Sequence, residues 1–315
     1  MFKKILFATT VTPDCDDAAK YAFDLAMKYS APLCIFHVFG IPSRGYSQNV
    51  INLKTGEKEE YCDEHDKIVT EEIEKAYDEQ FEIYQKTEVT CTVGTPSTEI
   101  LRKVKKDKID LIVMGAHTQI TDSEARRYRN VTGDTFQKVA KKAQCPVLVV
   151  SRPYQQNFWD LNNILFATDL SRATMSSFRF ALRLAQENKS KLHIFHSLAL
   201  SPQAPDEVIP QEELESRLKM TREKMQDLFV SEMGGFENYE LSVWEGIPYV
   251  EILKYSREKQ IDLITMASSS SSIFQNKETI GSTTEEVVLR SSCPIVSINR
   301  LDVLEEYGAF LAQGS

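Results

Sequence analysis

Two short segments place a glycine and a hydroxyl side chain where predicted helices begin. They are Gly133-Asp134-Thr135 and Gly281-Ser282-Thr283. The first turn of a helix has N–H groups without an intrahelical partner, and the helix dipole favours a negative charge there. A glycine lets the backbone approach such a ligand closely. The chemistry to consider at both segments is therefore binding of an anion such as a phosphate group.

Further candidate residues follow the predicted strands. Thr10 and Asp169 each come directly after an apolar run, and Gly115 and Ala267 each follow another. In an open α/β sheet, ligands bind outside the carboxyl ends of the strands. The residues to examine at these strand ends and helix starts therefore include Gly115 and Gly133 in the first half of the chain, and Asp169, Ala267, Ser270, Gly281, Ser282 and Thr283 in the second half.

The two halves are copies of one another. The pentapeptide ILFAT begins at Ile5 and again at Ile164, 159 residues later. Matching segments continue in the same order to CPV at Cys145 and CPI at Cys293, where the offset is 148. A domain usually has about 100–200 residues, so 315 residues suit two domains. We expect copy one at 1–153, a linker at 154–160, copy two at 161–300 and a C-terminal tail at 301–315.

Each copy alternates short apolar runs with segments of helical spacing. In copy one the apolar runs predict strands at 5–9, 33–39, 88–93, 111–114 and 147–150. Helical spacing predicts helices at 14–29, 66–84 and 134–143, and one that opens at Pro96, since proline suits a first helical turn. Five strands separated by helices predict an α/β fold with a doubly wound, five-stranded parallel sheet in each copy.

Composition narrows the classes of partner. The net charge is −9, and neither half is basic, which argues against nucleic acid and anionic membranes as partners. No apolar run reaches 18 residues, so no transmembrane helix is expected. Six cysteines are too few for a disulfide scaffold, which favours a reducing, cytoplasmic setting.

Taken together, these segments resemble the universal stress protein family. The resemblance is carried by DLIVMG at 110–115, the glycine at each helix start, and the closing segments CPVLVV at 145–150 and CPIVSI at 293–298. It covers nearly all of both copies and implies two adenine nucleotide alpha hydrolase-like domains. It also implies homodimerisation, commonly through the last strand, and a cytoplasmic stress-response role that acts through conformation and protein partners.

ATP-binding members of that family use the motif G-x2-G-x9-G-[ST], and copy one departs from it. Copy one keeps Gly115 and Gly133, but Thr118 replaces the second glycine. Asp134 follows Gly133 and would repel a phosphate, and Thr10 stands where an aspartate can accept hydrogen bonds from ribose or adenine. The resemblance therefore implies no nucleotide in copy one. We expect the long segment 41–66 to cover its pocket.

Copy two keeps more of the motif. Asp169 and the segment Gly281-Ser282-Thr283 are present, whereas Ala267 and Ser270 replace the first two glycines. The alanine is compatible with the motif only where its backbone φ is negative. The resemblance implies ATP or a related adenine nucleotide in copy two, with no metal beyond a nucleotide-bound Mg²⁺.

Two other functions remain open at this point. Ser and Thr cap helices without any ligand, so the segment at Gly281 also suits a nucleotide-free structural protein whose two copies pair within the chain. A slow ATP hydrolase is the third hypothesis, although the sequence offers no general base.

The segment Cys62-Asp63-Glu64-His65-Asp66 has metal-capable side chains, but no second pair of ligands accompanies it, so we expect no zinc site. His37 and His196 at equivalent strand ends are expected to be hydrogen-bonded structural residues.

Overall fold

The computed structural model describes residues 1–12, 15–40, 49–51, 56–116, 133–151, 161–199, 210–268 and 280–299. The chain divides into two compact units, Met1–Tyr154 and Gln155–Ser315. Copy one lies in the first unit and copy two in the second, and each is described by itself. The predicted linker 154–160 and the tail 301–315 lie outside the described residues.

The first unit contains seven described strands and five described helices. In chain order they are β1 (Ile5–Thr9), α1 (Asp16–Tyr29), β2 (Leu33–Gly40), β3 (Asn49–Ile51), β4 (Lys58–Glu60), α2 (Asp63–Ala76), α3 (Asp78–Ile83), β5 (Thr87–Gly94), α4 (Pro96–Asp107), β6 (Leu111–Gly115), α5 (Asp134–Lys142) and β7 (Val147–Val150). Strands β3 and β4 pair antiparallel, and the sequence analysis did not predict them.

The second unit repeats this order without a described hairpin after its second strand. Its elements are β8 (Asn163–Ala167), the 3₁₀ helix η3 (Arg172–Thr174), α6 (Met175–Asn188), β9 (Lys191–Leu198), α7 (Gln211–Phe229), the 3₁₀ helix η4 (Val230–Glu232), β10 (Tyr239–Glu245), α8 (Pro248–Glu258), β11 (Leu263–Ala267), α9 (Ser282–Arg290) and β12 (Ile295–Ile298).

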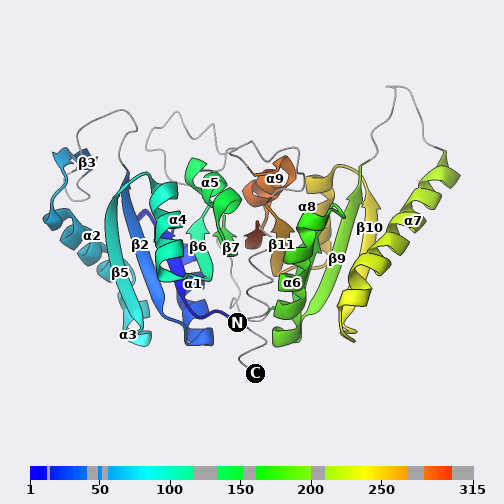
Figure 1. The fold of residues 1–315 in the computed structure, drawn as a ribbon, viewed down its shortest axis with the longest axis horizontal. Coiled ribbons are helices and arrows are strands. Elements are labelled where there is room, and N and C mark those ends of the chain that lie inside the picture. Colours follow the sequence, from blue (N-terminus) through cyan, green and yellow to red (C-terminus); the bar gives the residue numbers. More distant parts are fainter. Residues whose placement is uncertain are drawn as a thin grey trace. The chain divides into compact units, whose positions relative to one another are not determined.

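Five parallel strands form the main sheet of each unit. Their order is β7-β6-β1-β2-β5 in the first unit and β12-β11-β8-β9-β10 in the second. Helices cover both faces of each sheet (Figure 1), as in a doubly wound fold. The predicted α/β class with a parallel sheet is therefore confirmed. The strand order reverses beside β1 and β8, and the carboxyl ends next to such a reversal are where ligands bind in these folds.

An aromatic residue divides the helix that we predicted over 66–84. The ring of Tyr77 lies between α2 and α3, is buried, and has its centroid 6.2 Å from that of Phe7 on β1. The equivalent residue in copy two is Phe229, where α7 gives way to η4; its ring lies 5.3 Å from that of Phe166 on β8. The regular helix thus ends at the same aligned position in both copies, where an aromatic side chain packs on the central strand.

The aspartate of each Ile-Asp-Leu segment ties two strands together at their amino ends. Asp110 accepts hydrogen bonds from the backbone N–H groups of Lys3 at 2.7 Å and Lys4 at 3.1 Å. Asp262 accepts the equivalent bonds from Asn162 and Asn163, both at 2.8 Å. Both carboxylates are buried at the sheet edge remote from the candidate binding residues. Their role is therefore structural.

Candidate functional site

A cavity of about 390 Å³ lies at the carboxyl ends of β8 and β11 in copy two. Its wall combines strand ends, the start of α9 and the start of α8. The lining residues are Ala167, Thr168, Asp169, Thr174, Phe195, His196, Ser197, Pro248, Ile252, Met266, Ala267, Ile280, Gly281, Ser282, Thr283, Thr284 and Glu285. Five of the six residues predicted for copy two thus share one cavity. The sixth, Ser270, lies outside the described residues.

The start of α9 is fixed against the end of β11. The N–H of Gly281 donates to the carbonyl of Ser268 at 2.9 Å, and Thr284 Oγ1 donates to the carbonyl of Ala267 at 3.0 Å. Gly281 is the N-cap residue and has no side chain, so it cannot itself cap the first turn. The backbone N–H groups of Ser282 and Thr283 therefore belong to an uncapped helix end at the cavity wall, a favourable place for an anion.

Asp169 stands in a tight turn at the rim of the cavity. Its Oδ1 accepts the N–H of Ser171 at 3.0 Å. The next residue, Leu170, has a left-handed backbone with φ 62°, and its N–H donates to Thr168 Oγ1 at 2.9 Å. That conformation costs a non-glycine residue about 1–2 kcal/mol. Because α6 begins only at Met175, Asp169 does not cap that helix, and its exposed side chain lines the cavity instead.

The same strained turn occurs in copy one without the aspartate. Val11 has φ 59°, and its N–H donates to Thr9 Oγ1 at 3.0 Å. Thr10 occupies the place of Asp169. The turn is therefore a property of the fold, and the carboxylate is the feature that distinguishes copy two.

A histidine within the second strand of each sheet, beside the end of the first strand, supports the turn in each copy. The Nδ1 of His196 lies 2.8 Å from the carbonyl of Thr168, and that of His37 lies 3.1 Å from the carbonyl of Thr9. A ring N–H donates in each pair, because the carbonyl can only accept. Burial lowers the pKa of both histidines, and the hydrogen bond to the carbonyl partly opposes this. Both are therefore neutral, hydrogen-bonded residues near pH 7, as expected from the sequence.

The corresponding cavity in copy one holds only about 90 Å³. Its lining includes Gly115 and Gly133, the two candidate residues of copy one. The main difference is Phe136, which is buried there at the position of Thr284 in copy two. Val38 likewise replaces Ser197. We expected segment 41–66 to cover this pocket. Its residues 41–48 and 52–55 lie outside the described residues, and none of the others lines the cavity, whereas Phe136 of α5 does.

The family is decided by direct comparison with known proteins. The model of the Universal stress protein family matches residues 1–151 and matches again over residues 161–299. The chain belongs to the universal stress protein family. It is a tandem member, since one chain contains the family domain twice.

Two curated universal stress proteins and two solved structures illustrate this relationship. MJ0531 of Methanocaldococcus jannaschii is 29% identical over 162 residues, which cover 50% of this chain and 86% of the relative. MJ0577 of the same organism is 27% identical over 161 residues, covering 48% and 96%. A universal stress protein structure from Archaeoglobus fulgidus has a TM-score of 0.61 at 20% identity, covering 94% of this chain and 96% of the other. PA1789 from Pseudomonas aeruginosa PAO1 has a TM-score of 0.61 at 14% identity, covering 99% and 98%.

The fold of this tandem universal stress protein is adenine nucleotide alpha hydrolase-like. Its backbone shows whether alanine fits the first glycine position of the family motif. Ala267 stands at the first glycine position of the motif and lies at the end of β11, in extended backbone. Negative φ suits alanine as well as glycine, so this replacement leaves the backbone path unchanged.

No three His, Cys, Asp or Glu side chains among the described residues are grouped to hold a metal ion. None of the described helices has the length and hydropathy needed to span a bilayer.

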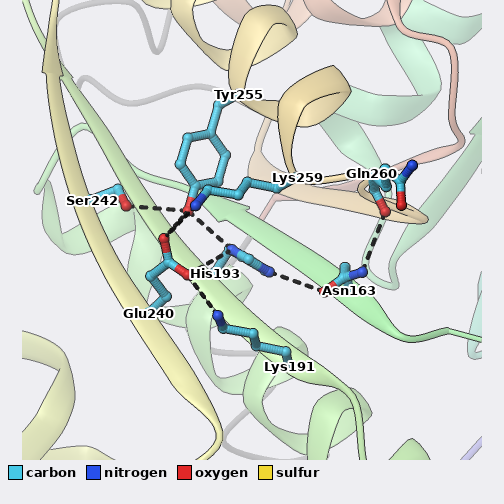
Figure 2. Close-up of polar contacts among 8 residues, drawn as sticks. All are labelled: Asn163, Lys191, His193, Glu240, Ser242, Tyr255, Lys259 and Gln260. Atoms are coloured by element: carbon cyan, nitrogen blue, oxygen red, sulfur yellow. Dashed lines mark hydrogen bonds and ion pairs between the residues drawn. The ribbon is translucent and has the colours of Figure 1, made fainter.

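A buried polar cluster lies at the opposite, amino-terminal end of the copy-two sheet (Figure 2). His193 Nε2 donates to Asn163 Oδ1 at 3.2 Å, and the amide of Asn163 donates in turn to the carbonyl of Gln260 at 3.4 Å. The hydroxyl of Tyr255 lies 2.9 Å from His193 Nδ1 and 3.4 Å from Oε1 of Glu240, and it can donate to either. Both ring nitrogens are thus used by a neutral imidazole. Glu240 lies beside them and pairs with Lys191 and Lys259 at 2.6 and 2.9 Å.

This cluster predicts a loss of stability at mildly acidic pH. Burial lowers the pKa of His193 from 6.5 to about 4, although Glu240 opposes the shift. Between pH 6.5 and pH 4, His193 is protonated in the unfolded chain but not in the folded chain. The free energy of unfolding therefore falls as the pH falls through this range. The expected loss is about 1–3 kcal/mol. Glu240 has a pKa lowered to about 2, so its ion pairs remain intact in this window.

Urea denaturation at pH 7.0, 6.0 and 5.0 checks this prediction. His193→Gln should flatten the decline because glutamine can bond to Asn163 and Tyr255 without titrating. His37 and His196 contribute in the same direction, since their pKa values are also lowered, so some decline should remain in the variant. A wild-type protein equally stable at pH 7 and pH 5 contradicts the prediction.

Proposed function

We propose that this tandem universal stress protein binds an adenine nucleotide in copy two only, and that the nucleotide sets the state in which it acts on partner proteins in a stress response. The observation that carries the proposal is the difference between equivalent cavities, about 390 Å³ in copy two and about 90 Å³ in copy one. Small-molecule sites usually have about 300–1,000 Å³, so only the first is large enough.

The cavity offers a partner for each part of such a ligand. The uncapped N–H groups at the start of α9 suit a phosphate. Asp169 can accept hydrogen bonds from ribose hydroxyls or from an adenine amino group. Phe195, Ile252 and Met266 form an apolar wall for the base. These assignments give a binding role to the candidate residues of copy two. They also add Thr284 and the apolar wall to the set of residues that line the site.

The carboxylates that line the copy-two cavity limit the negative charge that a ligand can bring into it. Asp169 and Glu285 both line the cavity, and its described lining contains no Lys or Arg. The helix end alone supplies about half a positive charge. We therefore propose that a polyphosphate enters with its Mg²⁺ ion, which offsets the negative charge beside the carboxylates.

A thermal-shift titration of the full chain with MgATP and with AMP tests the proposal. A ligand that binds the folded state at one hundred times its Kd stabilises it by about 2.7 kcal/mol. The shift should grow with ligand concentration and vanish in Asp169→Ala. Thr10→Ala changes the equivalent position of copy one and should leave the shift unchanged. Nucleotide released by heating the purified protein would give independent support, whereas no shift with either ligand would overturn the proposal.

A nucleotide-free structural role is the second candidate, and one observation favours it. Copy one fills its cavity with Phe136 and retains the same strand order as copy two. In copy one a side chain of the domain itself therefore lies where copy two has open space. The family resemblance further supports a cytoplasmic setting and homodimerisation. Sedimentation of the full chain with and without MgATP would test the dimer.

A further inference from the structure

The six cysteines of the chain occupy different environments, and one of them is exposed. Cys62 is exposed, whereas Cys15, Cys34, Cys145 and Cys293 are buried and Cys91 is half-buried. Burial raises the pKa of Cys91 to about 12 and also raises the pKa of Cys34 and of Cys293. A thiol must ionise to act as a nucleophile, so these three are held in the unreactive form near pH 7.

Cys62 stands at the start of α2 in contact with a buried imidazole. Its Sγ lies 3.2 Å from Nδ1 of His65. The backbone N–H of Cys62 donates to the same Nδ1 at 3.2 Å, so Nδ1 is an acceptor and the ring proton is on Nε2. The thiol and this N–H share the lone pair of Nδ1, and the thiol can transfer its proton to it. A capping box joins the two residues, in which the side chain of each faces the backbone N–H of the other.

A carboxylate completes the arrangement from the hairpin before the helix. Oε2 of Glu59 lies 3.4 Å from Nε2 of His65. The imidazole is only 4% exposed, and its Nε2 has no hydrogen-bond partner among the described residues, so Glu59 acts on it at ion-pair distance, a contact that strengthens when the ring accepts a proton. The rings of Tyr61 and Phe39 lie 6.1 and 6.2 Å from it and hold it in place. Thiol, imidazole and carboxylate thus follow one another as nucleophile, base and orienting group.

We propose that Cys62 is a reactive thiol that hydroperoxides oxidise to a sulfenic acid, with His65 as its base and Glu59 as the residue that positions His65. None of the three lines either cavity, so the proposal is independent of nucleotide binding. The thiol is exposed, so a small oxidant can reach it without a binding pocket. A small oxidant is therefore the substrate class that the site suits.

The reaction balances with a hydroperoxide as the only co-reactant. The Cys62 thiol gives its proton to Nδ1 of His65, and the sulfur attacks the terminal peroxide oxygen. A sulfur–oxygen bond forms and the oxygen–oxygen bond breaks, with its electron pair leaving on the second oxygen. That oxygen takes the proton from His65 and departs as an alcohol, or as water when the oxidant is hydrogen peroxide. Sulfur is oxidised by two electrons and the peroxide is reduced by two.

Trapping of the sulfenic acid in the full-length reduced protein tests the proposal. The protein is treated with limiting hydrogen peroxide in the presence of dimedone, and the adduct at each cysteine is followed by peptide mass spectrometry. Cys62 should be labelled first, and Cys62→Ser should abolish this fast phase. Glu59→Gln and His65→Asn should each slow it about tenfold or more, since a positioned base contributes at least that much.

Two further variants separate positioning from general charge or folding effects. Glu60→Gln removes the same charge from the neighbouring exposed residue and should leave the rate unchanged. Glu59→Asp keeps the carboxylate and should recover part of the rate that Glu59→Gln loses. Because His65 is buried, far-UV circular dichroism accompanies its variant, and Glu59→Gln decides the matter if His65→Asn does not fold. Labelling of Cys62 no faster than that of Cys91, or unaffected by Glu59→Gln, would overturn the proposal.

Discussion

Thr284→Phe is expected to abolish adenine-nucleotide binding, with affinity reduced by about a hundredfold or more, or about 2.7 kcal/mol. The variant gives copy two the residue that copy one carries at the equivalent position, Phe136. Thr284 is buried in the cavity wall, so a phenyl ring there must occupy space that the ligand needs. Isothermal titration of the full chain with MgATP measures the loss.

The matched control for this variant is Thr284→Val. Valine has nearly the same volume as threonine but cannot donate to the carbonyl of Ala267, a bond that measures 3.0 Å in the structure. The affinity of the Thr284→Val protein for MgATP should stay within a few-fold of that of the wild type, because the cavity keeps its volume. The unliganded melting temperature of Thr284→Phe verifies that the domain is folded. Binding that survives in a folded Thr284→Phe protein would place the nucleotide somewhere else.

Phe136→Ala is expected to destabilise copy one by about 3–5 kcal/mol, the usual cost of removing a buried phenyl ring. Phe136 is 1% exposed and packs at the wall of the 90 Å³ cavity. The truncation removes apolar contacts and enlarges that cavity. Urea denaturation followed by far-UV circular dichroism measures the effect.

Phe136→Leu provides a graded comparison for the same site. Leucine keeps much of the apolar volume, so its cost should be clearly smaller than that of alanine. Thr135→Ala, at the half-buried neighbouring position, should change stability by less than about 1 kcal/mol. A loss below about 1 kcal/mol for Phe136→Ala would contradict the packing role assigned to this ring.

Most of the fold could be predicted because it depends on local and repeated signals. The apolar runs at 5–9 and 147–150 are strands with those bounds, and Pro96 opens a helix as expected. The break at Tyr77 could not be predicted, because it depends on packing against Phe7, which lies far away in the sequence. The pairing of β3 with β4 was missed because three-residue strands give too little periodicity.

The candidate site was predicted in part, for reasons that individual residues make clear. Asp169 and Gly281 could be named because their residue types have chemical consequences and they follow or precede recognisable elements. Phe136 could not be predicted as a site residue although the repeat aligns it with Thr284, because an apolar residue at helical spacing is typical of ordinary core. The left-handed backbone at Leu170 could not be foreseen, since leucine disfavours it. The contact between Glu59 and His65 needs the hairpin that the sequence did not reveal.

The filled cavity of copy one has a consequence for how the chain would respond to changing ligand concentration. Under the proposed function, only one of the two equivalent cavities that the described residues form, the one in copy two, is large enough for a nucleotide. Two linked sites can give a steep, cooperative response, but one site within the chain gives a gradual hyperbolic one. We therefore expect each chain to respond to nucleotide concentration in a graded way under the proposed function, because duplication of the domain has not duplicated the large cavity among the described residues.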